Sequence, residues 1–155
     1  MPLQLKTYFT INLLLVELNM PSTNKITVVE PNQSGNLKSY AVIANDMVYV
    51  SATYGNNRLN RTIPEMFIDE AHQAFKNLSY ILEASGASSQ STIKVVIYLT
   101  SYKVAKAVND IFSNYFYAPY CARLQMQVER LPKNARISVE AIAIIQPVNK
   151  IKLEN

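Results

Sequence analysis

Hydrophobic and polar residues alternate along the last quarter of the chain, and this period of two predicts two strands on either side of a short turn. The apolar positions are Ala122, Leu124, Met126 and Val128 in the first strand and Ile137, Val139, Ala141 and Ala143 in the second. Pro132 restricts its own φ and Asn134 tolerates a positive φ, so residues 131–134 are predicted to form the turn. If the two apolar sides share a core, the intervening residues must share the opposite side of the sheet.

The opposite side would carry Arg123, Gln125, Gln127 and Glu129 from the first strand and Ser138 and Glu140 from the second. That side is polar, yet Ile142 and Ile144 also fall on it. A strand face left wholly in water does not usually carry isoleucine, so we expect another surface to cover part of it. An arginine at the start of a half-covered polar face is well placed to hold a carboxylate.

Further strands are predicted earlier in the chain. They are expected at residues 26–29, 40–44, 47–51 and 93–99, where β-branched and other apolar residues cluster. The dipeptide Asn45-Asp46 suits a tight hairpin turn between two of them. The strand at 93–99 is apolar on both sides, which is typical of a central strand.

Two helices are predicted from apolar residues that recur at helical spacing. The first is expected to begin at Pro64 and to stop at Gly86. The second follows a cap at Thr100 or Ser101. The resulting order, β-β-β-α-β-α-β-β, predicts an α+β fold in which two helices pack on one face of a single mixed sheet.

Composition narrows the class of protein. A chain of 155 residues with 49% hydrophobic residues can bury the core of one domain. Its single cysteine, Cys121, excludes an internal disulfide and favours a reducing, cytoplasmic location. With one histidine and three scattered glycines, we expect no metal site and no phosphate loop. The net charge of +4 comes from dispersed Lys and Arg residues, so a nucleic-acid partner is not favoured.

The two ends of the chain are set apart from this domain. We expect an N-terminal extension at residues 1–24, a domain at 25–147 and a tail at 148–155. The apolar stretch at 8–16 is too short to span a bilayer, and Asn12 interrupts it. No Ala-x-Ala cleavage pattern follows, so neither a membrane anchor nor a secretory signal is predicted. A misassigned start, a lineage-specific extension, an added strand, an oligomer contact and organellar targeting by residues 1–19 all stay open.

The segment "CAR…ERLPKNARISVEAIAII" resembles the C-terminal signature of the reactive-intermediate deaminase family, also called Rid, YjgF or L-PSP endoribonuclease-like. Three further segments fall in the same register: "MVYVSA" (47–52), "AHQAFKNLSYILEASGAS" (71–88) and "IKVVIYLTSYKVAKAVNDIFSNYF" (93–116). The resemblance runs from about residue 25 to residue 146, and several ordered matches are far more specific than one short motif.

The resemblance implies a chorismate-mutase-like homotrimer, in which three sheets form a barrel-like core and ligand clefts lie between subunits. It also implies an enamine/imine deaminase, a hydrolase that converts small 2-imino acids into 2-keto acids and ammonia without a metal or organic cofactor. The expected partners are therefore a small carboxylate-bearing imine or keto acid and two further copies of the chain, with no membrane.

The resemblance also assigns candidate site residues. Arg123 matches the family's carboxylate-binding arginine, and Ser138 stands where the family has the glutamate associated with the attacking water. These two residues are the catalytic candidates. The remaining substrate-binding candidates are Ser51, Asn109 and Ala122, together with Lys38 in place of a family Tyr, Ala52 in place of Gly and Gln125 in place of Cys.

The departures from the family pattern leave alternatives open. Serine is a poor base near neutral pH, so a deaminase of reduced activity is expected, with Glu140 as an alternative base. A non-catalytic trimer that binds a carboxylate ligand, or an RNA-directed role, are the alternative functions. Arg123 could instead be a structural residue paired with Glu129 or Glu140, and Cys121 could be a packed residue or a thiol whose pKa the arginine lowers.

Overall fold

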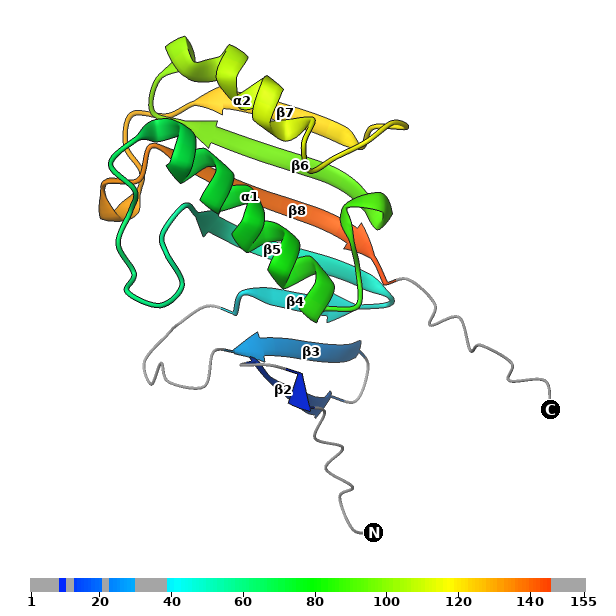
Figure 1. Cartoon of the computed structure of the whole chain (residues 1–155). Coiled ribbons are helices and arrows are strands. Elements are labelled where there is room, and N and C mark those ends of the chain that lie inside the picture. Colours follow the sequence, from blue (N-terminus) through cyan, green and yellow to red (C-terminus); the bar gives the residue numbers. More distant parts are fainter. Residues whose placement is uncertain (1–8, 11–12, 21–22, 30–38, 146–155) are drawn as a thin grey trace, which may run out of the picture.

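The computed structural model describes residues 9–10, 13–20, 23–29 and 39–145, with side-chain surroundings for 39–145. Within these ranges, eight strands form one mixed sheet in the order β1-β2-β3-β4-β5-β8-β6-β7 (Figure 1). The strands are β1 (Phe9–Thr10), β2 (Leu13–Met20), β3 (Thr23–Val29), β4 (Ala41–Ala44), β5 (Met47–Tyr54), β6 (Thr92–Leu99), β7 (Ala122–Gln127) and β8 (Ile137–Ile144). Neighbouring strands are antiparallel except for β6 and β7, which are parallel. Strands β1 and β2 fall inside the segment 1–24, and the predicted division of the chain into extension, domain and tail stays a prediction.

The helices α1 (Phe67–Ala84) and α2 (Ala105–Phe112) lie on the same face of this sheet (Figure 1). Short 3-10 turns occur at η1 (Ser89–Ser91), η2 (Tyr102–Val104) and η3 (Pro132–Asn134). The predicted α+β fold, with two helices on one face of a mixed sheet, is confirmed. Within the described ranges, no helix is both long and apolar enough to cross a membrane.

The hydrophobic core lies between the helices and the sheet. The largest of its fully buried apolar side chains come from α1, α2 and the three strands β5, β6 and β8: Val48, Phe75, Leu78, Leu82, Val95, Ile97, Leu99, Val108, Ile137 and Val139. On α1 the buried positions recur at helical spacing. On β6 the consecutive residues Val95, Val96 and Ile97 are all buried, as expected for a central strand that is apolar on both sides.

Local chemistry sets several element ends. Asn45 and Asp46 both have positive φ, which closes the β4–β5 hairpin as predicted. Gly86 follows the end of α1 and has a φ of 77°, the left-handed conformation in which glycine commonly ends a helix. The predicted start of α1 at Pro64 is wrong by three residues. Met66 is extended, and the Pro64 carbonyl accepts a hydrogen bond from the Arg136 side chain instead of beginning the helix.

The last two strands do not form the predicted hairpin. Both β7 and β8 pair with β6, which lies between them, and α2 carries the chain from β6 across to β7. The pairing of β7 with β6 therefore shows which residues of β7 face the helices. Val95 lies opposite both Arg123 and Ala141, so Arg123 is on the side of the helices.

The opposite side of the sheet faces away from α1 and α2, and we call it the helix-free face. Cross-strand pairing places on it Tyr49, Val96, Tyr98, Leu124, Met126, Ser138, Glu140, Ile142 and Ile144. The prediction that Leu124 and Met126 join the core is wrong, as is the prediction that Arg123 shares a face with Ser138. Alternation fixes the period of a strand but not its phase, and the helix side of β7 accommodates the arginine against α2.

Candidate functional site

Arg123 lies on β7, the outermost strand, with its side chain directed toward α2. One guanidinium nitrogen, Nη2, donates a hydrogen bond to Oδ1 of Asn109 at 2.5 Å. The guanidinium carbon lies 4.7 Å from the centre of the Phe112 ring. Asn109 and Phe112 are three residues apart on α2, which places them on neighbouring points of one helix face. The helix thus holds the guanidinium both at one edge and across one face.

The remaining donors of Arg123 are available for a ligand. Its side chain is exposed, and among the described residues it has no carboxylate partner, so the expected alternative pairing with Glu129 or Glu140 does not occur there. A planar guanidinium with open donors recognises a carboxylate through two parallel hydrogen bonds. The chain thus presents an oriented cation at one edge of the sheet.

Two other candidates lie on the same strand. Gln125 follows Arg123 on the helix side and is half-buried, and its Oε1 is buried with no hydrogen-bond partner in the part of the chain that the structure describes. Ala122 is exposed and points to the helix-free face, opposite Lys94. Gln125 is therefore on the same side of β7 as the guanidinium, and Ala122 is not.

The candidates on β5 are remote from Arg123 within one chain. Ser51 and Ala52 lie at an irregularity between Val50 and Thr53, where the register of β5 against β8 shifts. The Ser51 hydroxyl donates to the carbonyl of Ser39 at 2.7 Å. Strands β5 and β7 are separated by β8 and β6, so they are about 14 Å apart at the usual strand spacing. Lys38 lies outside the described residues.

Ser138 is also separated from Arg123. It lies on the helix-free face of β8, across the sheet from the arginine, and it is 1% exposed. Its hydroxyl has no hydrogen-bond partner within the described ranges, and its cross-strand neighbours are Tyr54 and Tyr98. Therefore one chain by itself does not bring the two expected catalytic residues together.

A polar pair beside Ser138 was not predicted. The Tyr98 hydroxyl donates to Oε1 of Glu140 at 3.2 Å, and both side chains are half-buried. Burial, the charge of Glu140 and this hydrogen bond together raise the pKa of Tyr98. The sequence shows only that the two residues lie on alternating strands. Their proximity depends on β6 pairing with β8, which the sequence analysis did not predict.

The helix-free face also exposes a set of large apolar side chains. These are Tyr49, Leu124, Met126 and Ile144, each between 39% and 46% exposed in the single chain. Apolar side chains gathered on one face are characteristic of a surface that another protein covers. The expected need for a covering surface thus applies to this face, which carries Ser138 and Glu140 and not Arg123.

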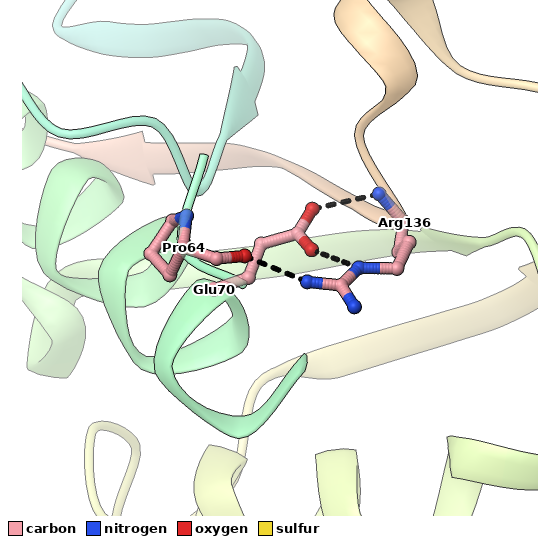
Figure 2. A network of polar contacts seen from close by, with 3 residues as sticks. All are labelled: Pro64, Glu70 and Arg136. Carbon is pink, nitrogen blue, oxygen red and sulfur yellow. Dashed lines mark hydrogen bonds and ion pairs between the residues drawn. The ribbon is translucent and has the colours of Figure 1, made fainter. Parts of the chain in front are cut away.

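The start of β8 is anchored to α1 by an ion pair whose carboxylate is buried (Figure 2). Glu70 is completely buried and accepts hydrogen bonds from the Arg136 backbone N–H at 2.7 Å and from its Nε at 2.5 Å. Nη2 of Arg136 donates to the Pro64 carbonyl at 2.8 Å. This group of three residues, the Glu70 clamp, fixes residue 136 directly before the buried strand positions Ile137 and Ser138.

Cys121 directly precedes β7. Burial raises the pKa of its thiol more than the nearby charge of Arg123 lowers it. The expected lowering by the arginine is thus present but outweighed, and the thiol stays protonated near neutral pH. Within the described ranges, no group of three or more His, Cys, Asp or Glu residues is arranged to hold a metal ion.

Comparison with known proteins identifies the family. Residues 27–145 match the family model "Endoribonuclease L-PSP". The chain is 38% identical over 109 residues to a 2-iminobutanoate/2-iminopropanoate deaminase from Dermatophagoides farinae, covering 70% of this chain and 85% of that protein. It is 33% identical over 116 residues to the human deaminase of the same name, covering 74% and 85%.

Solved structures of similar proteins support the same family. RidA from an Antarctic Psychrobacter species superposes with a TM-score of 0.69 at 31% identity, covering 73% of this chain and 92% of that one. E. coli TdcF with bound serine gives a TM-score of 0.67 at 27% identity, with coverages of 73% and 91%. The chain therefore belongs to the Endoribonuclease L-PSP family, which includes the reactive-intermediate deaminases.

Proposed function

We propose that this protein is a deaminase that hydrolyses small 2-imino acids to 2-keto acids and ammonia in clefts between the subunits of a homotrimer. The observation that carries the proposal is the guanidinium of Arg123, held by Asn109 and Phe112 with open donors at the edge of the sheet. Relatives named 2-iminobutanoate/2-iminopropanoate deaminase support the substrate class. The serine bound to TdcF is a small amino acid, and it carries a carboxylate as the proposed 2-imino acid substrates do.

The arginine binds the substrate carboxylate, and the reacting carbon is one bond away from it. Two parallel N–H···O bonds orient the imino acid so that one face of its C=N bond is open to water. Phe112 covers one side of the guanidinium and limits its solvation, which strengthens the interaction with an anion. The binding step thus requires no metal and no organic cofactor.

The division of the candidate residues supports the proposed trimer. Arg123 is on an outer edge, whereas Ser138, Glu140 and the exposed apolar side chains are on the helix-free face. An edge of one copy laid on the helix-free face of the next joins two different surfaces. Such a heterologous contact closes into a ring when its rotation permits, and a rotation of one third of a turn gives a trimer. Each cleft would then contain Arg123 from one subunit and the helix-free face, with Ser138 and Glu140, from the next.

The serine at position 138 favours a reduced rate, because the hydroxyl is buried and is not a base. A trimer that binds a carboxylate ligand without catalysis is the second candidate, and the same observation favours it. Activity decides between the two. Both candidates share Arg123 and the trimer, so loss of ligand binding in an Arg123 variant does not separate them, whereas a measured rate above uncatalysed hydrolysis does.

The test is a coupled assay in which an amino acid oxidase generates 2-iminopropanoate and the accelerated release of ammonia is measured. Wild type is expected to exceed the uncatalysed rate, and Arg123→Ala is expected to abolish the excess. Lys106→Ala removes an exposed cation from α2, the helix that contacts Arg123, and serves as the matched control, with no effect expected. Light scattering should give three times the 17.5 kDa of one chain. A stable monomer, or an Arg123→Ala variant with full activity, would overturn the proposal.

A cytoplasmic location is the corresponding proposal for the compartment, supported by the single cysteine. One relative, from Arabidopsis thaliana, is named chloroplastic, so residues 1–19 deserve a direct test. Fusion of residues 1–19 to a fluorescent protein should leave the fluorescence in the cytoplasm. Fluorescence confined to an organelle would contradict this proposal.

A further inference from the structure

Position 138 has no carboxylate in this chain, but a carboxylate lies two residues further along the same strand face. We propose that Glu140, held in place by Tyr98, is the group that accepts the proton of the attacking water. The inference rests on the proposed deaminase function and names the base for that same cleft. Glu140 is the catalytic residue in this proposal, and Tyr98 is a positioning residue.

The first support is the geometry of the pair. Tyr98 lies directly opposite Ser138 in the β6–β8 register, and Glu140 lies opposite Val96. The tyrosine side chain therefore leans diagonally along the sheet, and its hydroxyl meets Oε1 of Glu140 at 3.2 Å. In the part of the chain that the structure describes, Oε2 of Glu140 has no hydrogen-bond partner. One carboxylate oxygen is thus fixed and the other is open.

The second support is the contrast with Ser138. Its hydroxyl is buried and unpartnered, whereas Glu140 and Tyr98 are half-exposed on the face that carries the apolar residues Leu124 and Met126. Successive residues on one strand face are about 6.8 Å apart, and a glutamate side chain spans much of that distance. Glu140 is thus a half-exposed carboxylate two residues along the same strand face from Ser138, whose hydroxyl is buried.

The protonation state of the tyrosine fits a positioning role. Burial, together with the charge and hydrogen bond of Glu140, raises the pKa of Tyr98, so the phenol keeps its proton at neutral pH. A protonated phenol can donate to the carboxylate but cannot replace it as a base. The hydrogen bond restricts the rotamers of Glu140 and leaves its second oxygen to bind water.

The reaction balances with these groups. A water molecule attacks the iminium carbon, a C–O bond forms, and the C=N pair moves onto nitrogen while Glu140 takes one water proton. Protonated Glu140 then returns this proton to the nitrogen of the resulting carbinolamine. The C–N bond breaks, and ammonia leaves and takes up the hydroxyl proton as ammonium, so the products are a 2-keto acid and ammonium. Arg123 of a neighbouring subunit holds the carboxylate throughout.

The experiment compares isosteric variants of the full-length trimer. Glu140→Gln should lower kcat at least about 100-fold, near the lower limit for general-base catalysis. Tyr98→Phe should lower kcat about tenfold and leave KM unchanged. The substitution removes the hydrogen bond that orients Glu140, and it does not change Arg123, which binds the substrate carboxylate. Both variants should keep the trimer mass, the melting temperature within about 3 °C of wild type and wild-type affinity for pyruvate, since these do not depend on the base.

Rescue separates catalysis from structure. Adding Ser138→Glu to Glu140→Gln puts a carboxylate back on the same strand face and should recover at least about tenfold in kcat. Tyr102→Phe and Glu83→Gln change an exposed tyrosine and an exposed glutamate elsewhere and should leave kcat unchanged.

The outcomes separate this inference from the proposed function. If wild type is active, Arg123→Ala is inactive and both Glu140→Gln and Tyr98→Phe stay within twofold of wild type, the inference is wrong and the proposed function stands. A wild type without activity overturns both.

Discussion

Replacing Arg136 by methionine should destabilise the folded chain strongly. The substitution keeps an unbranched side chain that can pack along the Phe67 ring, but it removes the guanidinium that bonds to Glu70 and to the Pro64 carbonyl. Glu70 is fully buried and, among the partners that the structure describes, would retain the backbone N–H of residue 136. The carboxylate would then be a buried charge without its counterion.

The magnitude follows from the burial of the two side chains. Removing one partner of a buried ion pair typically costs about 3–5 kcal/mol of unfolding free energy. The Arg136 side chain is 39% exposed while that of Glu70 is fully buried, so we expect a value near the lower end, about 3 kcal/mol. For a chain of this size that corresponds to a fall in Tm of roughly 6–12 °C.

The assay is thermal unfolding followed by circular dichroism at one fixed protein concentration, because assembly makes Tm depend on concentration. Lys106→Met is the matched control, since it removes a cation from an ion pair whose side chains are 89% and 68% exposed. It should move Tm by no more than about 2 °C. Adding Glu70→Gln to Arg136→Met removes the stranded charge, so the double variant should lose less than the sum of the two single losses. An Arg136→Met protein that melts within 2 °C of wild type would refute the reasoning.

Three further predictions concern the Arg123 guanidinium, the helix-free face and the packing of α1. Arg123→Lys should retain weak pyruvate binding by calorimetry while Arg123→Ala loses it, because one ammonium cannot supply two parallel hydrogen bonds; equal affinities would contradict this. Leu124→Glu places a charge on the helix-free face and should shift light scattering from trimer to monomer, and an intact trimer would show that no subunit covers this residue. Gly55→Ala should lower Tm by more than the lysine control, because its Cβ would lie 2.1 Å from the Glu70 carbonyl oxygen, and an unchanged Tm would show that α1 can move away.

The sequence predicts those features of the fold that depend on local chemistry. The order of the elements after residue 25, the Asn45-Asp46 turn and the positive φ of Asn134 are found as expected. Each follows from the period of apolar residues or from a residue that suits an unusual φ. The family resemblance, which rests on ordered segments along most of the chain, is also confirmed.

Long-range pairing was not predicted. Alternation in β7 gives the correct period, but only its pairing with β6 shows that Leu124 faces away from the helices. The bond between Tyr98 and Glu140 joins residues 42 positions apart, and the Glu70 clamp joins residues 66 positions apart. No local pattern encodes such contacts. The bond of Arg123 to Asn109 joins two residues that the family resemblance had assigned to the site, although no local pattern shows the bond itself.

The division of the site between subunits is the central claim, and mixing two inactive variants tests it most directly. Arg123→Ala chains keep the helix-free face intact, and Glu140→Gln chains keep the arginine intact. When the two are unfolded together and refolded at equal amounts, each interface of the ring has about a one-in-four chance of joining an intact arginine to an intact glutamate. The account predicts recovery of about a quarter of wild-type deaminase activity in the mixture. Activity no greater than that of the separate variants, in mixed trimers verified by mass spectrometry, would show that both residues act within one chain.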